Sequence, residues 1–192
     1  MKYSEFNYVL HLIDVYEETE KCYNNLPSYH DEEYKLAVHE NPFDFEQEEL
    51  SAKYEKASEN VQTKLDELES EIFTYITVPE FEELRANKRL FNNYFVNKAL
   101  DVLAVSFPDV ECNIKGLIEI GKEAAEIKDK INKWIPDELW GEDICSDEDL
   151  YEYLDQHPEL STTENEDTCK VWGKIDTLLD AALEMEIDRS ER

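Results

Sequence analysis

The chain has 192 residues, of which 48 are Asp or Glu and 19 are Lys or Arg, so its formal charge at pH 7 is −29. This acidity excludes nucleic-acid binding through a basic patch, because each phosphate contact needs a cation, and it opposes binding to an anionic membrane surface. Apolar residues make up 41% of the sequence and aromatic residues 11%, which is enough to bury a core and argues against disorder throughout. The length favours one domain, or one and a half.

The N-terminus has no secretory character. Residues 1–5 carry one Lys followed by an acidic, aromatic run, without the apolar region of a signal peptide. No apolar stretch approaches the ~18–20 residues that a membrane-spanning helix needs. The four cysteines are isolated, with no CxxC pair, which favours reduced thiols over a disulfide framework. We therefore expect a cytoplasmic protein that binds no membrane.

Breaks in the chain are few, since the sequence has four glycines and six prolines, and the segments between them have the period of helices. A first helix is expected over residues 4–24, where apolar residues recur every three or four positions. A short helix is expected over 31–40, with Asp31 as its N-cap, and a turn is expected over 41–44.

The clearest predicted element begins after this turn and reaches Thr77. Asp44 and Gln47 have the spacing of a capping pair at its start. Its apolar residues are spaced by three and four positions without interruption, which predicts a single helix of about 30 residues, roughly 45–50 Å long. These residues are Leu50, Tyr54, Ala57, Val61, Leu65, Leu68, Ile72 and Tyr75.

Two further helices are expected in the middle of the chain. Pro79 suits the first turn of a helix that reaches about Ser106. Pro108 is expected to begin the next helix, whose apolar residues keep the helical spacing as far as Pro136. Two glycines within this second helix weaken it, by up to ~1 kcal/mol each relative to Ala.

The charge composition of the chain changes after these helices. Residues 134–169 contain thirteen acids and no Lys or Arg. Ser146 and Asp149 fit a capping box, which predicts a short helix over 146–156. A second capping box over 161–164 predicts the start of a C-terminal helix.

The predicted fold is all-α, since neither β-alternation of useful length nor a repeat of about 20–50 residues is found. We expect an elongated helical bundle with one central helix of about 30 residues and a shorter acidic C-terminal helical segment. The main bundle is expected over 1–136, and 137–192 is expected to hold the acidic segment and a C-terminal helix that packs on the same body. A single domain is the alternative.

The familiar motifs of catalysis and metal binding do not occur in the sequence. The Glu-x-x-His spacing of di-iron bundles is absent, and so is HExxH. The acidic run that starts at Asp143 lacks the Gly that an EF-hand needs at its sixth position. GxxxxGK[ST], GxGxxG and GxSxG do not occur either. We therefore predict that the protein is not an enzyme and that it has no catalytic residue, no metal site and no cofactor.

The acidic surface is the positive feature of the sequence. On the long predicted helix, at ~100° per residue, a set of acids lies on the outward face with no Lys between its members. This set is Glu48, Glu55, Glu59 and Asp66. A second set lies in the acidic segment and comprises Asp143, Asp147, Glu148, Asp149, Glu152 and Asp155. Each set is either an ordinary solvated helix face or a row of carboxylates that replaces phosphate oxygens as acceptors for Arg and Lys.

The total charge also matches a length of DNA. B-DNA carries about one charge per 1.7 Å of axis, so a charge of −29 corresponds to roughly 50 Å, about the length of the long predicted helix. In composition the chain resembles the DNA-mimic antirestriction and anti-CRISPR proteins of phages and mobile elements. The resemblance implies a stoichiometric inhibitor that occupies the cationic groove of a nucleic-acid-binding protein, such as a restriction or CRISPR-type nuclease complex. No motif carries it, so it assigns no role to any residue.

One segment has the opposite charge. Residues 84–100 contain no acid, and their cations are Arg85, Lys88, Arg89 and Lys98. These cations either pair with acids of the same chain or meet the acidic segment of a second copy, which would make a homodimer.

Two other classes of function fit the same sequence. One is an immunity or antitoxin protein that holds a basic toxin by specific contacts, and the other is an acidic structural or scaffolding protein whose charge secures solubility. The mimic and the immunity protein both require a basic protein as partner, and neither binds nucleic acid directly.

Overall fold

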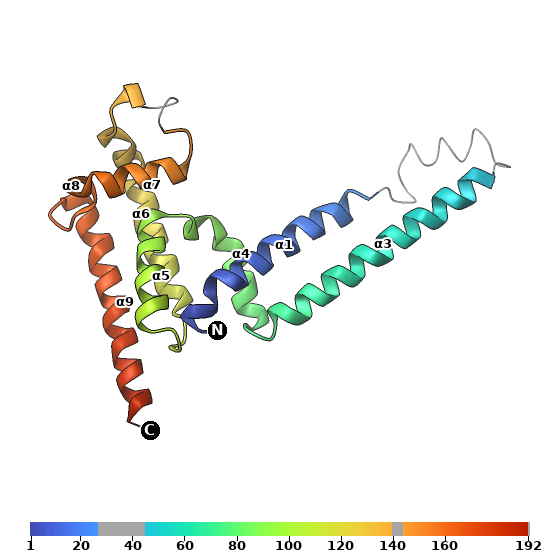
Figure 1. The fold of residues 1–192 in the computed structure, drawn as a ribbon, viewed down its shortest axis with the longest axis horizontal. Helices are drawn as coiled ribbons and strands as arrows, with labels where there is room; N and C mark the ends of the chain where they lie inside the picture. Colours follow the sequence, from blue (N-terminus) through green and yellow to red (C-terminus); the bar gives the residue numbers. More distant parts are fainter. Residues whose placement is uncertain (27–44, 140–143, 192) are drawn as a thin grey trace. The chain divides into compact units, whose positions relative to one another are not determined.

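The computed structural model describes residues 1–26, 45–139 and 144–191. Within these ranges every named element is a helix and no β-strand occurs, so the predicted all-α class is confirmed (Figure 1). The elements are η1 (Tyr3–Glu5), α1 (Phe6–Asn24), α3 (Phe45–Ile72), α4 (Val78–Phe91), α5 (Tyr94–Ser106), α6 (Ile114–Trp134), η2 (Asp137–Leu139), α7 (Asp147–Gln156), α8 (Pro158–Ser161) and α9 (Glu166–Ser190). The helix expected over 31–40 and the capping residue Asp44 lie outside the described residues.

The chain folds as two compact units. Residues 8–81 form one, which we call the hairpin unit, and residues 1–7 with 82–192 form the other, which we call the bundle unit. The change in composition after Pro136 lies inside the bundle unit and does not coincide with this division. In the described ranges, no helix is both long enough and apolar enough to cross a membrane.

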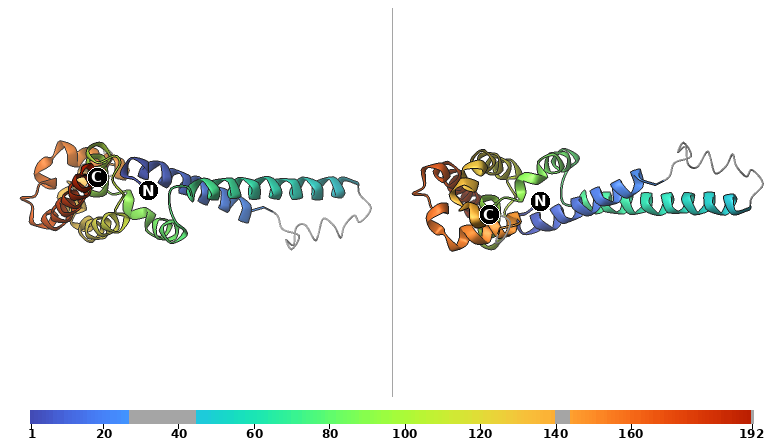
Figure 2. Two further views of the ribbon diagram at one scale, coloured as in Figure 1. Left: turned by 90° about the horizontal axis from the view of Figure 1, so that it is seen from below. Right: turned by 90° about the horizontal axis from the view of Figure 1, so that it is seen from above.

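In the hairpin unit, α1 and α3 lie side by side (Figure 2). The Tyr16 hydroxyl donates a hydrogen bond to Glu69 at 2.8 Å, and the Tyr8 hydroxyl donates to Glu71. The buried side chains of the two helices are Val9, Leu12, Ile13 and Tyr16 of α1 and Leu65, Leu68 and Ile72 of α3. The apolar stripe predicted for the long helix is therefore buried in its C-terminal part.

α3 has 28 residues and ends at Ile72, before the end predicted at Thr77. A turn follows, in which the Ile76 N–H donates to the Ile72 carbonyl at 3.2 Å. Thr77 directly precedes α4, and the Glu80 carboxylate in the first turn accepts hydrogen bonds from the Thr77 N–H at 2.8 Å and from its hydroxyl at 2.7 Å. Ile76, in this turn, is buried too. The spacing of apolar residues therefore continues beyond Ile72 and does not reveal where the helix ends.

The single helix predicted from Pro79 to Ser106 is wrong, because α4 and α5 are separate helices. Asn92 and Asn93 lie between them. The Asn93 side chain accepts a hydrogen bond from the Phe95 N–H at 2.9 Å and caps α5. Asn side chains compete with the helical backbone for such bonds, which explains why the helix breaks here.

α6 begins at Ile114, not at Pro108 as predicted. The Asn113 side chain accepts a hydrogen bond from the Gly116 N–H at 3.0 Å and so caps the helix. A proline fits the first turn of a helix but does not require one, whereas the capping bond satisfies a backbone donor that the first turn leaves open.

The cap of α7 is confirmed and that of α9 is corrected. Ser146 and its capping box begin α7 as predicted. The capping box expected over 161–164 does not begin the C-terminal helix. α9 starts at Glu166, where the Asn165 side chain accepts a hydrogen bond from the Asp167 N–H at 3.0 Å.

In the bundle unit, α5, α6 and α9 pack against one another (Figure 1). Their shared core includes Leu103, Leu117, Ile120, Ala124, Val171, Ile175 and Leu178. Asp109 ties the two ends of the chain to this core, because it pairs with Lys2 at 2.8 Å and with Arg189 at 3.2 Å. These bonds, that of Lys2 first, hold the pKa of Asp109 below its ordinary value.

α6 approaches the end of α4 closely at Gly121. A Cβ atom at this position would lie 2.7 Å from Leu90 Cβ and 3.0 Å from the Leu90 carbonyl oxygen, and a backbone oxygen cannot move aside as a flexible side chain can. Gly173, an exposed residue of α9, offers a matched contrast, because no atom lies within 4 Å of the Cβ it would carry.

We expect Gly121→Ala to lower the free energy of unfolding, because overpacking strain of about 1–3 kcal/mol exceeds the gain of ~1 kcal/mol in helix propensity. Gly173→Ala should raise the free energy of unfolding by up to ~1 kcal/mol, since it gains propensity without a clash. Urea unfolding of both variants measures the difference. A Gly121→Ala variant as stable as Gly173→Ala would contradict the close approach of α6 and α4.

Candidate functional site

The acids predicted on the long helix form an exposed row on α3. Glu55, Glu59 and Asp66 are all exposed, and at ~100° per residue they lie within about 40° of one another around the helix axis. Asp66 accepts a hydrogen bond from Gln62 at 2.9 Å on the same face. The side chain of Glu48 lies outside the described part of the structure. We call Glu55, Glu59 and Asp66 the α3 row.

The acids predicted between 143 and 155 are described in part, and they differ in how far they are engaged within the protein. Asp143 lies outside the described residues, and so does the side chain of Asp147, although its backbone begins α7. Glu148 and Glu152 are exposed, and Glu152 accepts a hydrogen bond from Gln156 at 3.4 Å. The remaining two acids of this set are held by contacts within the protein.

Asp149 is the third residue of α7 and completes the capping box that Ser146 begins. One of its carboxylate oxygens accepts hydrogen bonds from the Ser146 hydroxyl at 2.8 Å, from the Ser146 N–H at 2.9 Å and from the Cys145 N–H at 2.9 Å. These bonds, the one from the Ser146 hydroxyl first, lower the pKa of Asp149. Its carboxylate stabilises the start of a helix and is not fully available to a partner.

Asp155 pairs with a cation from the patch that the sequence singled out. Its carboxylate lies 3.0 Å from Lys98 Nζ, and this ammonium also lies 5.4 Å from the centre of the Tyr94 ring. The hydrogen bond to Asp155 raises the pKa of Lys98. For this pair, the alternative of pairing within one chain is the one observed. Arg85 and Lys88 also hold interactions within the chain.

A row of acids on α9 was not predicted. Its members are all exposed and recur at every fourth residue: Asp176, Asp180, Glu184 and Asp188. At ~100° per residue they span about 120° around the helix and are centred roughly opposite the buried face, which is formed by Val171, Ile175, Leu178 and Ala182. We call these four acids the α9 row. It extends over about 18 Å at ~1.5 Å per residue.

Nearby cations are engaged by other acids. Lys174 lies 3.6 Å from Glu119 and 3.6 Å from Glu123, both on α6, and Arg189 pairs with Asp109 and Glu186. In the described part of the chain, no ion pair involves a member of the α9 row. The row therefore presents four carboxylates to solvent without a compensating cation.

The α9 row could have been found in the sequence. Counting angles along the C-terminal helix, as was done for the long helix, places these acids opposite the apolar stripe. The engagement of Lys174 and Arg189 could not have been found, because their partners Glu119 and Asp109 are distant in the chain.

The described His, Cys, Asp and Glu residues do not gather in groups of three or more that could hold a metal ion. What the two acidic rows can do is accept charge-assisted hydrogen bonds from Lys or Arg of another molecule. Comparisons of the chain with protein-family models, with curated proteins and with solved structures find no match in any of the three.

The cap formed by Asp149 predicts a pH-dependent contribution to stability. Asp149→Ala should lower the melting temperature at pH 7. Because its folded pKa lies below the unfolded one, this stabilisation is present above about pH 4 and is lost as the pH falls through the folded pKa. The gap in melting temperature between wild type and variant should therefore narrow in acid.

Glu152→Ala, on the same helix, is the matched control. It also removes one carboxylate and also introduces a good helix former, but it removes no cap, so its melting temperature at pH 7 should equal or exceed that of wild type. Equal effects of Asp149→Ala and Glu152→Ala, measured by circular dichroism, would show that Asp149 is ordinary surface.

Proposed function

We propose that the protein is an acidic stoichiometric inhibitor that acts as a DNA mimic and occupies the cationic groove of a nucleic-acid-binding protein, such as a restriction or CRISPR-type nuclease complex. The observation that carries the proposal is the α9 row, whose four exposed carboxylates have no cation partner among the described residues. The α3 row supports it with a second exposed line of carboxylates. Such an inhibitor acts in the cytoplasm, where its target cleaves DNA.

The energetics favour many weak contacts. An exposed ion pair contributes ~0–1 kcal/mol, so no single carboxylate accounts for tight binding, whereas several rows together do. A cationic groove that has evolved to bind phosphates offers Arg and Lys side chains to any anion that fits it, and Arg pairs with carboxylates in two parallel hydrogen bonds. Each row presents carboxylates about 6 Å apart where they recur every fourth residue.

The immunity or antitoxin protein remains the alternative, and a structural or scaffolding role is the third. An immunity protein concentrates its binding energy in a few buried anchors, often aromatic, each of which costs ~2 kcal/mol or more on truncation. The distribution of binding energy over the surface therefore distinguishes an immunity protein from a mimic. A scaffolding protein is distinguished from both proposals for inhibition because it inhibits no nuclease.

The first test is inhibition of DNA cleavage by a panel of purified restriction and CRISPR-type nucleases. The mimic should inhibit at least one of them completely at a one-to-one ratio to its binding site, and added duplex DNA should compete with it. The purified protein should not bind duplex DNA itself. If no nuclease is inhibited, or if the protein binds duplex DNA at physiological salt, the proposal is wrong.

The second test assigns the inhibition to the rows. Replacing all four acids of the α9 row by Lys should weaken inhibition by about 2–4 kcal/mol, which is about thirty- to a thousandfold. Replacing the α3 row by Lys should also weaken it, and Asp180→Asn alone should change it by less than about tenfold.

A control variant with the same change in net charge separates the effect of the α9 row from the effect of the protein's total charge. It carries Lys at four exposed acids that lie on three different helices and in the turn before α9: Glu82, Asp101, Glu126 and Glu164. This control should inhibit almost as well as wild type, because its charges do not form a row. Equal loss in the control and in the α9 variant would show that the α9 row is ordinary solvated surface.

A further inference from the structure

The C-terminal turns of α9 combine exposed apolar side chains with the acids of the α9 row. Leu183 exposes 47% of its surface and Ile187 exposes 48%. The buried residues of α9 end at Ala182, and none of the described residues 183–191 is buried. Leu183 and Ile187, which we call the apolar pair, therefore lie in water on the same helix as the row.

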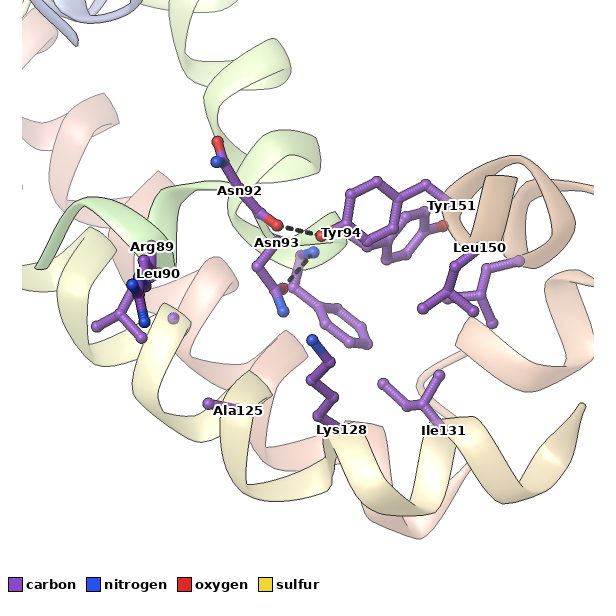
Figure 3. A pocket seen from close by; sticks show the side chains of 13 residues that line it. Arg89, Leu90, Asn92, Asn93, Tyr94, Ala125, Lys128, Ile131, Leu150 and Tyr151 are labelled. Atoms are coloured by element: carbon purple, nitrogen blue, oxygen red, sulfur yellow. Dashed lines mark hydrogen bonds between the residues drawn. The ribbon is translucent and has the colours of Figure 1, made fainter. Parts of the chain in front are cut away.

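Most large apolar side chains of the bundle unit are covered, even where the surface is hollowed. Ile131 and Leu150 line a pocket of about 220 Å³ (Figure 3), yet each of them exposes at most 6% of its surface. The apolar pair has no such cover. About half of each of its two side chains is available to another molecule, and covering that surface would stabilise a complex.

Helix geometry places each member of the apolar pair next to a carboxylate of the α9 row. Leu183 follows Asp180 by three residues, and Ile187 is in the same relation to Glu184. A separation of three residues puts two side chains about 60° apart around the axis and about 4.5 Å apart along it, so they are neighbours. Side chains of a helix lean toward its N-terminus, which brings each apolar group toward the acid that precedes it. Met185 is also exposed, but it lies about 160° from Leu183 and is not part of this surface.

The charge of the α9 row alone is lower than that of the DNA it would replace. Its four carboxylates extend over about 18 Å, a length over which B-DNA carries about ten charges. Each exposed ion pair also contributes little, because salt screens it. For this surface to displace DNA, contacts other than ion pairs must add to its affinity.

We propose that the apolar pair binds the aliphatic stems of Lys and Arg side chains of the partner's groove, whose charged heads pair with Asp180 and Glu184. Lys and Arg cover apolar surface with their methylene groups while the head stays in a polar environment. A compact cation would leave the apolar pair uncovered, and an apolar partner would remove water from the carboxylates without supplying a cation. The inference deepens the proposed function and rests on it for the identity of the partner.

The test compares two cations of equal charge. N-acetyl-trilysine amide carries three ammonium groups on flexible four-carbon stems, whereas hexaamminecobalt(III) carries the same charge and no carbon. Each is titrated into the ¹⁵N-labelled full chain, and binding is followed by the chemical shifts of the backbone amides of α9. Both cations should give saturable shifts over residues 176–188, because the carboxylates of the α9 row attract both.

A double substitution removes the apolar pair and keeps every charge. Leu183→Ala together with Ile187→Ala should weaken the binding of trilysine at α9 about threefold or more, and it should leave the binding of hexaamminecobalt(III) unchanged. Val102→Ala together with Val105→Ala, at two exposed positions of α5, is the matched control and should change neither affinity. Ala is the best helix former, and circular dichroism verifies that both double variants are folded.

Three results would each overturn the inference. The first is the absence of saturable shifts on α9 with trilysine. The second is an equal loss of affinity for trilysine and hexaamminecobalt(III) in the α9 double variant, which would show that the methylene stems make no contact. The third is a loss of affinity for trilysine that is no larger in the α9 double variant than in the α5 control.

A nuclease assay keeps this inference separate from the proposed function. If trilysine behaves as expected and no nuclease is inhibited, the contact with cationic side chains stands and the proposed inhibition is wrong. If a nuclease is inhibited, Leu183→Ala together with Ile187→Ala should weaken the inhibition about threefold or more at both 50 and 200 mM NaCl, because salt does not screen the burial of apolar surface. Unchanged inhibition by this variant would overturn the inference and leave the proposed function standing.

Discussion

Repulsion among carboxylates is the constraint on which the rest of this structure depends. A net charge of −29 on 192 residues opposes compaction, and the opposing free energy comes from burial of apolar helix faces. Accordingly, almost all buried side chains are apolar, and the charged side chains lie at the surface. Among the described residues, the buried polar side chains are Ser161 and Thr168, and no Asp or Glu is buried. Most of the described acids therefore keep contact with water, where their mutual repulsion is screened.

Five of the cations lie at places where separate parts of the bundle unit meet. Lys98 joins α5 to α7 through Asp155, and Lys130 joins α6 to α9 through Asp167. Lys174 links α9 to α6, and Lys2 and Arg189 bring both chain ends to Asp109. Placing cations at helix contacts relieves repulsion where the helices approach, and the four acids of the α9 row remain exposed on the outer face of α9. In this way the fold and the proposed function use the same distribution of charge.

Much of the fold could be predicted from the sequence, because the period of apolar residues is a direct consequence of helix geometry. The all-α class and α1 followed from this period, and the cap of α7 followed from the spacing of Ser146 and Asp149. The breaks after Phe91 and before Ile114 did not, because they are made by the Asn93 and Asn113 side chains, and Asn is tolerated inside helices as well as at their caps. An apolar period cannot distinguish a helix from a helix followed by a tight turn, as the end of α3 at Ile72 shows.

Less of the candidate site could be predicted. Glu55, Glu59 and Asp66 are exposed as their helical angles indicated, whereas Asp149 and Asp155 proved to be held by a cap and an ion pair. The partner of Asp155 is 57 residues away in the chain, and no pattern of local spacing reveals such a pair.

The most direct test of the central claim, that the acidic surface replaces DNA in a cationic groove, is the salt dependence of the complex with an inhibited nuclease. Isothermal titration between 50 and 200 mM NaCl measures the Kd at each concentration. Because contacts between exposed charges are screened over the Debye length, ~8 Å at 0.15 M, the account predicts that the affinity falls by at least about tenfold over this range, in parallel with the affinity of the same nuclease for DNA. An affinity that does not change with salt would contradict it, and would indicate a partner held by buried apolar anchors.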